Sequence, residues 1–120
     1  KNKGEYRMKK ATPEELNNAA MQMILYAGNS RNMINEALRA TENGDERDCV
    51  DAKMKEAKDE ITKAHKIQTD MIQSTIEDDE LQTTLLFTHA QDTLMTIYSE
   101  LNMATHMIKM CRMLEDKVNK

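Results

Sequence analysis

The stretch LLFTHAQDTLMT, residues 85–96, sets a histidine and an aspartate three positions apart among leucine, methionine and threonine. A neutral imidazole is a competent nucleophile near pH 7, and it can accept a phosphoryl group on one ring nitrogen while the other nitrogen is held by a hydrogen bond. Phosphoryl transfer requires mainly positioning and charge compensation, which one imidazole with polar neighbours can meet. Hydrolysis would need a second acid or base and an oxyanion hole, and the sequence offers neither. If this stretch performs chemistry, phosphoryl transfer on His89 is therefore favoured over hydrolysis.

A helix through this stretch places these polar groups on a line that is otherwise apolar, taking about 100° per residue. The line consists of Leu85, His89, Asp92, Thr93, Thr96, Met103, Met107, Met110 and Leu114. Because its second half is wholly apolar, we expect the line to be buried, which requires Asp92 to be neutralised, hydrogen-bonded, bound to a cation or left in a wet cavity. The alternative is a structural pair in which His89 and Asp92 bridge locally on an exposed shoulder.

Three helical segments must position this line. Thr12 begins the first as an N-cap, with a proline at the first helical position and Glu15 completing a capping box. Asn43-Gly44 ends that segment, and Asp45 is placed to cap the second helix. The acidic run 77–80 marks the second turn, ahead of a third helix. We expect helices over about 13–43, 46–75 and 82–118.

Buried positions follow from the apolar spacing of three, four and seven residues in the first two segments. The first segment offers Leu16, Ala20, Met23, Ala27, Ile34 and Leu38. The second offers Cys49, Ala52, Ala57, Ile61, Ala64, Ile67 and Met71 or Ile72. Short connections make neighbouring helices antiparallel, so the fold class is all-α, an up-down-up antiparallel three-helix bundle. We expect one domain over 12–120, preceded by a flexible basic tail over 1–11.

Composition excludes several classes of protein. The net charge of −4 and pI near 5.4 argue against a nucleic-acid carrier, since phosphate contacts need clustered Lys and Arg. No apolar run approaches the roughly 18 residues of a membrane span, so we expect no membrane insertion. Glycine-rich phosphate loops, CxxC pairs and HExxH are absent. Cys49 and Cys111 are expected to be free thiols in a reducing cytosol, and a structural disulfide is the minor alternative.

The third segment carries apolar residues over a wider arc than a monomeric three-helix bundle requires. The chain also contains 11 methionines, which fill irregular cores and protein-binding surfaces equally well. A homo-oligomer that buries the surplus is the economical explanation, and a broad Met-rich core within one chain is the alternative.

Three stretches carry a family resemblance: THAQDTLMT, AHKIQTDMI at 64–72, and YAGNSRNMINEAL at 26–38 with its ENGD turn at 42–45. Together they resemble the lactose/cellobiose (chitobiose)-type enzyme IIA of the bacterial phosphoenolpyruvate-dependent sugar phosphotransferase system. The resemblance runs from about Glu14 to near Val118. It implies a cytoplasmic three-helix subunit that assembles as a homotrimer and acts as a phosphotransferase component in the uptake of a lactose/cellobiose-class sugar.

The resemblance also implies roles for three residues. His89 would accept phosphate from the phosphocarrier protein HPr and pass it to a cysteine of the sugar-specific IIB component. Gln91 is expected near the phosphohistidine. Asp92 would meet its symmetry mates on the three-fold axis around a divalent metal such as Mg²⁺, which would make a carboxylate on an apolar line tolerable.

One position departs from the family pattern, which usually reads HAQDHLM. This chain has Thr93 in place of the second histidine, so any help to the phosphate there could come only from a neutral hydroxyl. His65 lies in a matched block, and we expect it to be packed and bonded within the bundle rather than to be a second acceptor; His106 is expected on the surface. The competing hypothesis for the whole chain is a helical adaptor without chemistry, whose Met-rich face binds partner helices and whose His89 is structural.

Overall fold

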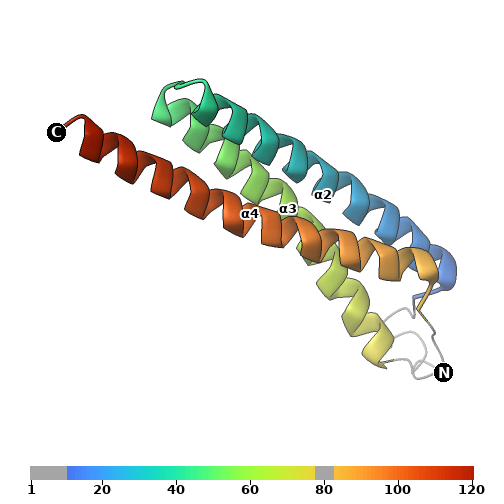
Figure 1. Cartoon of the computed structure of the whole chain (residues 1–120). Coiled ribbons are helices and arrows are strands. Elements are labelled where there is room, and N and C mark those ends of the chain that lie inside the picture. Colours follow the sequence, from blue (N-terminus) through green and yellow to red (C-terminus); the bar gives the residue numbers. More distant parts are fainter. Residues whose placement is uncertain (1–10, 78–82) are drawn as a thin grey trace, which may run out of the picture.

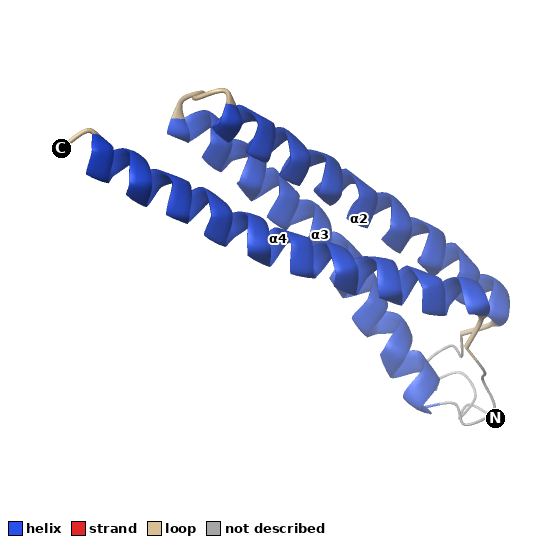
Figure 2. Ribbon diagram, in the orientation of Figure 1, coloured by secondary structure: helices blue, strands red, loops and turns tan. Residues whose placement is uncertain are grey.

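The computed structural model describes residues 11–77 and 83–120, which form three long helices and, within these ranges, no strand (Figure 1, Figure 2). Helix α2 spans Pro13–Glu42, α3 spans Arg47–Glu77 and α4 spans Leu85–Val118. The predicted all-α up-down-up bundle is confirmed. The expected basic tail lies outside the described residues except for Ala11, which is buried, and most of the acidic second turn lies outside them as well.

Helix α2 begins where the capping box was expected. The Glu15 backbone N–H donates to Thr12 Oγ1 at 3.1 Å, and the Thr12 N–H donates to Glu15 Oε1 at 2.9 Å. This reciprocal pair satisfies two of the backbone donors that a helix start leaves without partners.

The turn between α2 and α3 is closed by backbone hydrogen bonds around Gly44. The Asp45 N–H donates to the Ala40 carbonyl at 2.9 Å and the Gly44 N–H donates to the Thr41 carbonyl at 3.1 Å, while Gly44 has φ of 75°. This Schellman arrangement needs a left-handed residue, which glycine supplies without strain. Helix α3 consequently begins at Arg47 and not at 46, because Asp45 still belongs to the turn and the Glu46 carbonyl accepts the first helical bonds.

The two ends flanking the second turn also differ from the expected bounds. Helix α3 continues to Glu77, past the expected end at 75, and the Thr75 hydroxyl donates to the Ile72 carbonyl at 2.7 Å within it. Helix α4 begins at Leu85 and not at 82, since Thr84 is its N-cap and accepts from the Phe87 N–H at 3.1 Å.

Helix α2 packs against both other helices, whereas α3 and α4 contact each other least (Figure 1). The main buried cluster contains Leu16, Ala20, Met23, Ala27, Ile34, Ala57, Ile61, Ala64, Phe87, Ala90, Leu94, Ile97, Leu101 and Ala104. Five of the six positions expected on the first helix are therefore buried. The expectation for Cys49 and Ala52 was wrong: both are exposed, because Val50 occupies the core position at the start of α3.

Candidate functional site

His89 lies on α4, one turn inside its N-terminal end, and its side chain is exposed. The neighbouring core residues Phe87 and Ala90 anchor this turn of α4 in the bundle. The Thr93 hydroxyl donates to the His89 backbone carbonyl at 2.9 Å, so Thr93 bonds within the helix. The site therefore presents an accessible imidazole on a rigid helix.

The expected burial of the His89 line is not found within the chain. The buried face of α4 consists of Phe87, Ala90, Leu94, Ile97, Leu101, Ala104 and Ile108, on the opposite side of the helix. Thr93 is half-buried and the other members of the line are exposed. The reason is that α2 and α3 cover only one side of α4, so most of this line lies outside the bundle core.

His89 belongs to the flank of α4 that faces α2. Glu100, about three turns beyond His89 on the same side, accepts both guanidinium hydrogen bonds of Arg31 from α2, each at 2.9 Å. Met107, about five turns beyond His89, lines a shallow groove with α2 side chains. The hydrogen bonds from Arg31 to Glu100 raise the pKa of the Arg31 guanidinium, and this bidentate pair joins α4 to α2 at the bundle surface.

Gln91 belongs to the other flank of α4, which faces α3. Tyr98, about two turns beyond Gln91, packs edge-on against His65 of α3 with ring centroids 5.8 Å apart. Lys109, about five turns beyond Gln91, lines a groove between α3 and α4. The chain therefore does not bring the Gln91 side chain, which is half-buried, to the same side of the helix as His89.

Asp92 lies between these flanks, on the outward face of α4. Its side chain is exposed, and it shares its side of the helix with Met103 and Met110, which are 53% and 55% exposed. Within the described ranges no ion pair joins Asp92 to His89, so the local bridge considered from the sequence is not formed. No group of three His, Cys, Asp or Glu side chains in the described part of the chain could hold a metal ion.

The other sequence-based expectations concern histidine and cysteine. His65 packs against Tyr98 as described, and it is exposed at the bundle surface and not enclosed in it. His106 is exposed, as expected. Cys49 and Cys111 are free thiols, as the sequence predicted.

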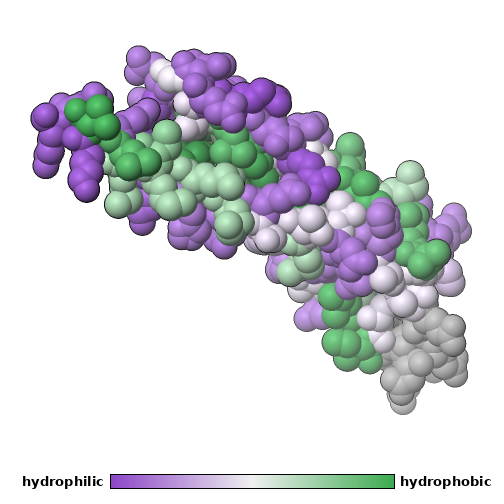
Figure 3. Space-filling view, in the orientation of Figure 1, coloured by the Kyte–Doolittle hydropathy of each residue, from purple (hydrophilic) through white to green (hydrophobic). Residues whose placement is uncertain are grey.

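Exposed apolar side chains gather along α4. The large ones are Leu85, Met95, Met103, Met107, Met110, Met113, Leu114 and Val118, each more than half exposed. Figure 3 shows apolar side chains on the surface near the C-terminal end of this helix. Large exposed apolar patches on a protein surface mark interaction sites, so the Met-rich second half of α4 is a candidate one.

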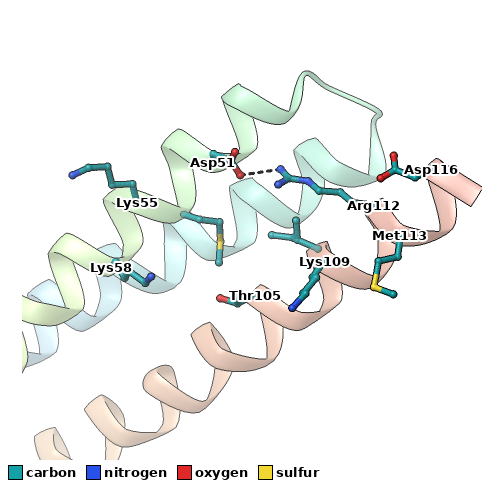
Figure 4. Close-up of a pocket in the computed structure, with 10 residues that line it drawn as sticks. Asp51, Lys55, Lys58, Thr105, Lys109, Arg112, Met113 and Asp116 are labelled. Atoms are coloured by element: carbon teal, nitrogen blue, oxygen red, sulfur yellow. Dashed lines mark hydrogen bonds and ion pairs between the residues drawn. The ribbon is translucent and has the colours of Figure 1, made fainter.

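A second feature, which sequence reasoning missed, is a groove of about 460 Å³ between the first half of α3 and the last half of α4. Figure 4 shows Lys58 and Lys109 extending into it from opposite helices, beside the Arg112 to Asp51 ion pair at 2.9 Å. These residues are far apart in the sequence, and only the antiparallel packing brings them together. The groove lies at the end of the bundle away from His89.

Comparison with known proteins agrees with this architecture. Residues 18–112 match the model of the family described as PTS system, lactose/cellobiose specific IIA subunit. The lichenan-specific phosphotransferase enzyme IIA component of Bacillus subtilis is 36% identical over 97 residues, covering 81% of this chain and 87% of that protein. The lactose-specific EIIA component of Lacticaseibacillus casei is 32% identical over 110 residues, covering 92% and 97%.

Solved structures give the same result. The crystal structure of PtcA from S. mutans superposes on this structure with a TM-score of 0.79. The two sequences are 34% identical, and the match covers 85% of this chain and 99% of the PtcA chain. The cellobiose-specific enzyme IIA from Bacillus anthracis superposes with a TM-score of 0.77 at 34% identity, covering 89% and 95%. The chain belongs to the lactose/cellobiose-specific IIA family of the sugar phosphotransferase system.

None of its described helices is long and apolar enough to cross a membrane.

Proposed function

We propose that the protein is a cytoplasmic phosphoryl carrier that accepts phosphate from phospho-HPr on His89 and passes it to the IIB component during uptake of a lactose/cellobiose-class sugar. The observation that supports this role most directly is the exposed imidazole of His89, held on a rigid helix within the family motif HAQD. An accessible nucleophile is what transfer between two protein partners requires.

The proposed step exchanges one phosphorus–nitrogen bond for another. A neutral ring nitrogen of His89 forms a bond to phosphorus as the bond from phosphorus to the donor imidazole breaks. The His89 proton remains on its other ring nitrogen, and the donor histidine leaves with its electron pair. In the second step the thiolate of the IIB component attacks the same phosphorus as the bond from phosphorus to His89 breaks, and His89 departs with that electron pair as a neutral imidazole that still carries the proton on its other ring nitrogen.

We propose further that the chain works as a homotrimer. The exposed apolar side chains of α4 lie opposite its core face and so are free to pack against the α4 helices of two other copies. If the three α4 helices pack in parallel, their polar first halves contact one another and their Met-rich second halves contact one another. Antiparallel packing would place Asp92 among methionines at a high desolvation cost.

A divalent metal such as Mg²⁺ fits such a trimer and does not fit one chain. One exposed carboxylate is too few ligands for a cation, whereas three Asp92 carboxylates around an axis would offer the oxygen ligands that hard cations prefer. The bound metal would supply positive charge that offsets carboxylate repulsion.

Replacement of Asp92 tests this metal role. We expect Asp92→Asn to abolish metal binding and to make the midpoint of thermal unfolding independent of added Mg²⁺, because a neutral amide leaves no carboxylate to share. The measurements are metal content by mass spectrometry and unfolding with and without EDTA. Glu56→Gln, an exposed carboxylate on α3, is the control. A D92N trimer with wild-type metal content would exclude the ligand role.

The carrier function is tested by phosphorylation with phosphoenolpyruvate, enzyme I and HPr, followed by peptide mass spectrometry under alkaline conditions. We expect one acid-labile phosphoryl group on the peptide containing His89. The His89→Gln variant should fold with wild-type helicity and carry no label. His106→Gln, an exposed histidine on the same helix, is the matched control and should be labelled normally.

Two results would contradict the proposal. Label on another residue would refute the assignment of His89. A folded wild-type chain without label, in a mixture where HPr is phosphorylated, would refute the carrier role. That second result would favour the adaptor hypothesis, for which the exposed apolar side chains of α4 provide the binding surface.

A further inference from the structure

The groove between the first half of α3 and the last half of α4 has the size and the apolar lining of a small-molecule site. Its volume of about 460 Å³ lies within the roughly 300–1,000 Å³ of typical ligand pockets. Its apolar lining consists of Ile108, which is 5% exposed, the half-buried Met54 and the exposed Met113. Methionine side chains adapt to the shape of what they contact. This lining favours a ligand with an apolar body over one covered in hydroxyl groups.

The charged side chains of the groove leave two lysines without acidic partners. Six charged residues line it: Asp51, Lys55, Lys58, Lys109, Arg112 and Asp116. Arg112 pairs with Asp51 at 2.9 Å, Lys55 pairs with Asp59 at 3.2 Å, and Asp116 pairs with Arg47 at 2.8 Å. Lys58 and Lys109 form no ion pair with any described residue.

These two lysines extend into the groove from opposite helices (Figure 4). Thr105, which also lines the groove, donates its hydroxyl proton to the Leu101 carbonyl at 2.8 Å, so the lysine ammonium groups are the donors left for a ligand. The groove is thus locally positive in a chain whose net charge is −4. Two ammonium groups on opposite walls match a phosphomonoester, which carries about −1.5 to −2 charges at pH 7 and three acceptor oxygens.

We propose that this groove binds a soluble phosphomonoester with an apolar body. The phosphoryl oxygens accept hydrogen bonds from Lys58 and Lys109, and the apolar body packs on Ile108 and the two methionines. The chain's net negative charge disfavours an anionic membrane surface as the source of the phosphate. The site lies on the α3-facing flank of α4, away from His89 and from the outward face proposed for assembly, and it does not depend on the proposed carrier function.

Isothermal titration calorimetry of the full chain with three probes tests this ligand class. Naphthyl phosphate has both the phosphate and an apolar body, glycerol phosphate replaces that body with hydroxyl groups, and naphthol lacks the phosphate. We expect saturable binding of naphthyl phosphate, and binding at least about fivefold weaker for each of the other probes, because each lacks one of the two kinds of contact.

Naphthyl phosphate should also raise the midpoint of thermal unfolding, because a ligand that binds only the folded chain stabilises it. In this groove the ligand would bridge α3 and α4, the two helices that contact each other least. An absence of saturable binding at millimolar concentrations would overturn the proposal, as would an affinity for either control probe equal to that for naphthyl phosphate. Cosedimentation with vesicles containing phosphatidic acid, without binding of naphthyl phosphate, would indicate a membrane surface instead.

Variants of the lining residues locate the bound probe. Lys58→Gln and Lys109→Gln should each weaken binding of naphthyl phosphate by about fivefold or more, the loss of one charge-assisted hydrogen bond. Lys66→Gln, an exposed lysine of α3 outside the groove, is the matched control and should bind normally. Thr105→Trp fills part of the groove without changing its charge and should abolish binding, with circular dichroism showing unchanged helicity. Wild-type affinity in both K58Q and K109Q, or in a folded T105W, would overturn the assignment.

Discussion

Three residues close together on α4 face three different sides of the helix: His89, Gln91 and Asp92. His89 lies on the flank facing α2, Gln91 on the flank facing α3, and Asp92 on the outward face between them. Their proximity in the sequence predicts a common site, but a helix turns about 100° at each residue. Of the three side chains, only that of His89 therefore lies on the α2-facing flank. Gln91 faces α3, and Asp92 faces the surface where further copies are proposed to pack.

At the same scale, Glu60 links α2 to α3 and responds to pH. It accepts hydrogen bonds from Lys63 at 2.8 Å and from Asn29 at 3.0 Å. These bonds, first that from Lys63 and then that from Asn29, lower the pKa of Glu60 below its ordinary value of 4.5. The folded state thus binds fewer protons than the unfolded state in this range, so the contribution to stability is present above about pH 4.5 and is lost as pH falls through the folded pKa.

We predict that Glu60→Gln loses less stability than wild type between pH 6 and pH 3. The variant has no carboxylate to protonate, although its amide oxygen can still accept from Asn29. Thermal unfolding followed by circular dichroism across this range measures the difference. Glu56→Gln, whose exposed carboxylate forms no ion pair with a described residue, should follow the wild-type slope. Identical slopes for all three proteins would show that Glu60 does not contribute to the acid sensitivity.

At the scale of elements, the helix ends are decided by a few local hydrogen bonds. Thr12 and Thr84 begin α2 and α4 by accepting backbone N–H groups three residues later. Gly44 ends α2 through its positive φ. Because each connection is short, these ends also fix which helices lie antiparallel.

We predict that Gly44→Ala destabilises the protein by about 1 kcal/mol, because alanine is strained at a φ of 75°. Gly28→Ala is the matched control, since Gly28 lies inside α2 and an added Cβ would meet no atom within 4 Å beyond its neighbours and the backbone of its own helix. That variant should be stabilised by up to about 1 kcal/mol, the helix propensity of alanine over glycine. Urea unfolding measures both. Equal effects at the two positions would contradict the conformational explanation.

At the scale of the whole molecule, the uneven packing of α4 matters most. Helix α2 contacts both of its neighbours extensively, whereas α3 and α4 leave a groove between them (Figure 4). The outward side of α4 consequently remains uncovered along its Met-rich half. Helix α4 thus has one face that packs into the bundle core and a second apolar face that is exposed. This is the arrangement expected of a subunit in an oligomer.

We predict that Met107→Glu weakens assembly by about tenfold or more without unfolding the subunit, because it would bury a charge in the proposed interface. Met107 is 51% exposed in the single chain, so the fold itself tolerates the substitution. Leu25→Glu is the control: Leu25 is 59% exposed on the opposite side of α2 from the buried Leu16. Analytical ultracentrifugation over a concentration series measures both. Unaltered association of M107E would exclude this surface from the interface.

The sequence by itself determined the helices, the first turn and the family, because capping residues, apolar spacing and short motifs act over a few neighbouring positions. It also identified His89 as the proposed nucleophile, because the motif around that residue is equally local. Only the tertiary structure decided which side of α4 is covered, because that depends on α2 and α3 packing against it from distant parts of the chain. The apolar second half of the line through His89 and Asp92 predicts burial, but Phe87, Leu94 and Leu101 form the core face of α4 instead. The helical period alone separates Gln91 from His89, but only the packing decided that the His89 flank faces α2 and the Gln91 flank faces α3.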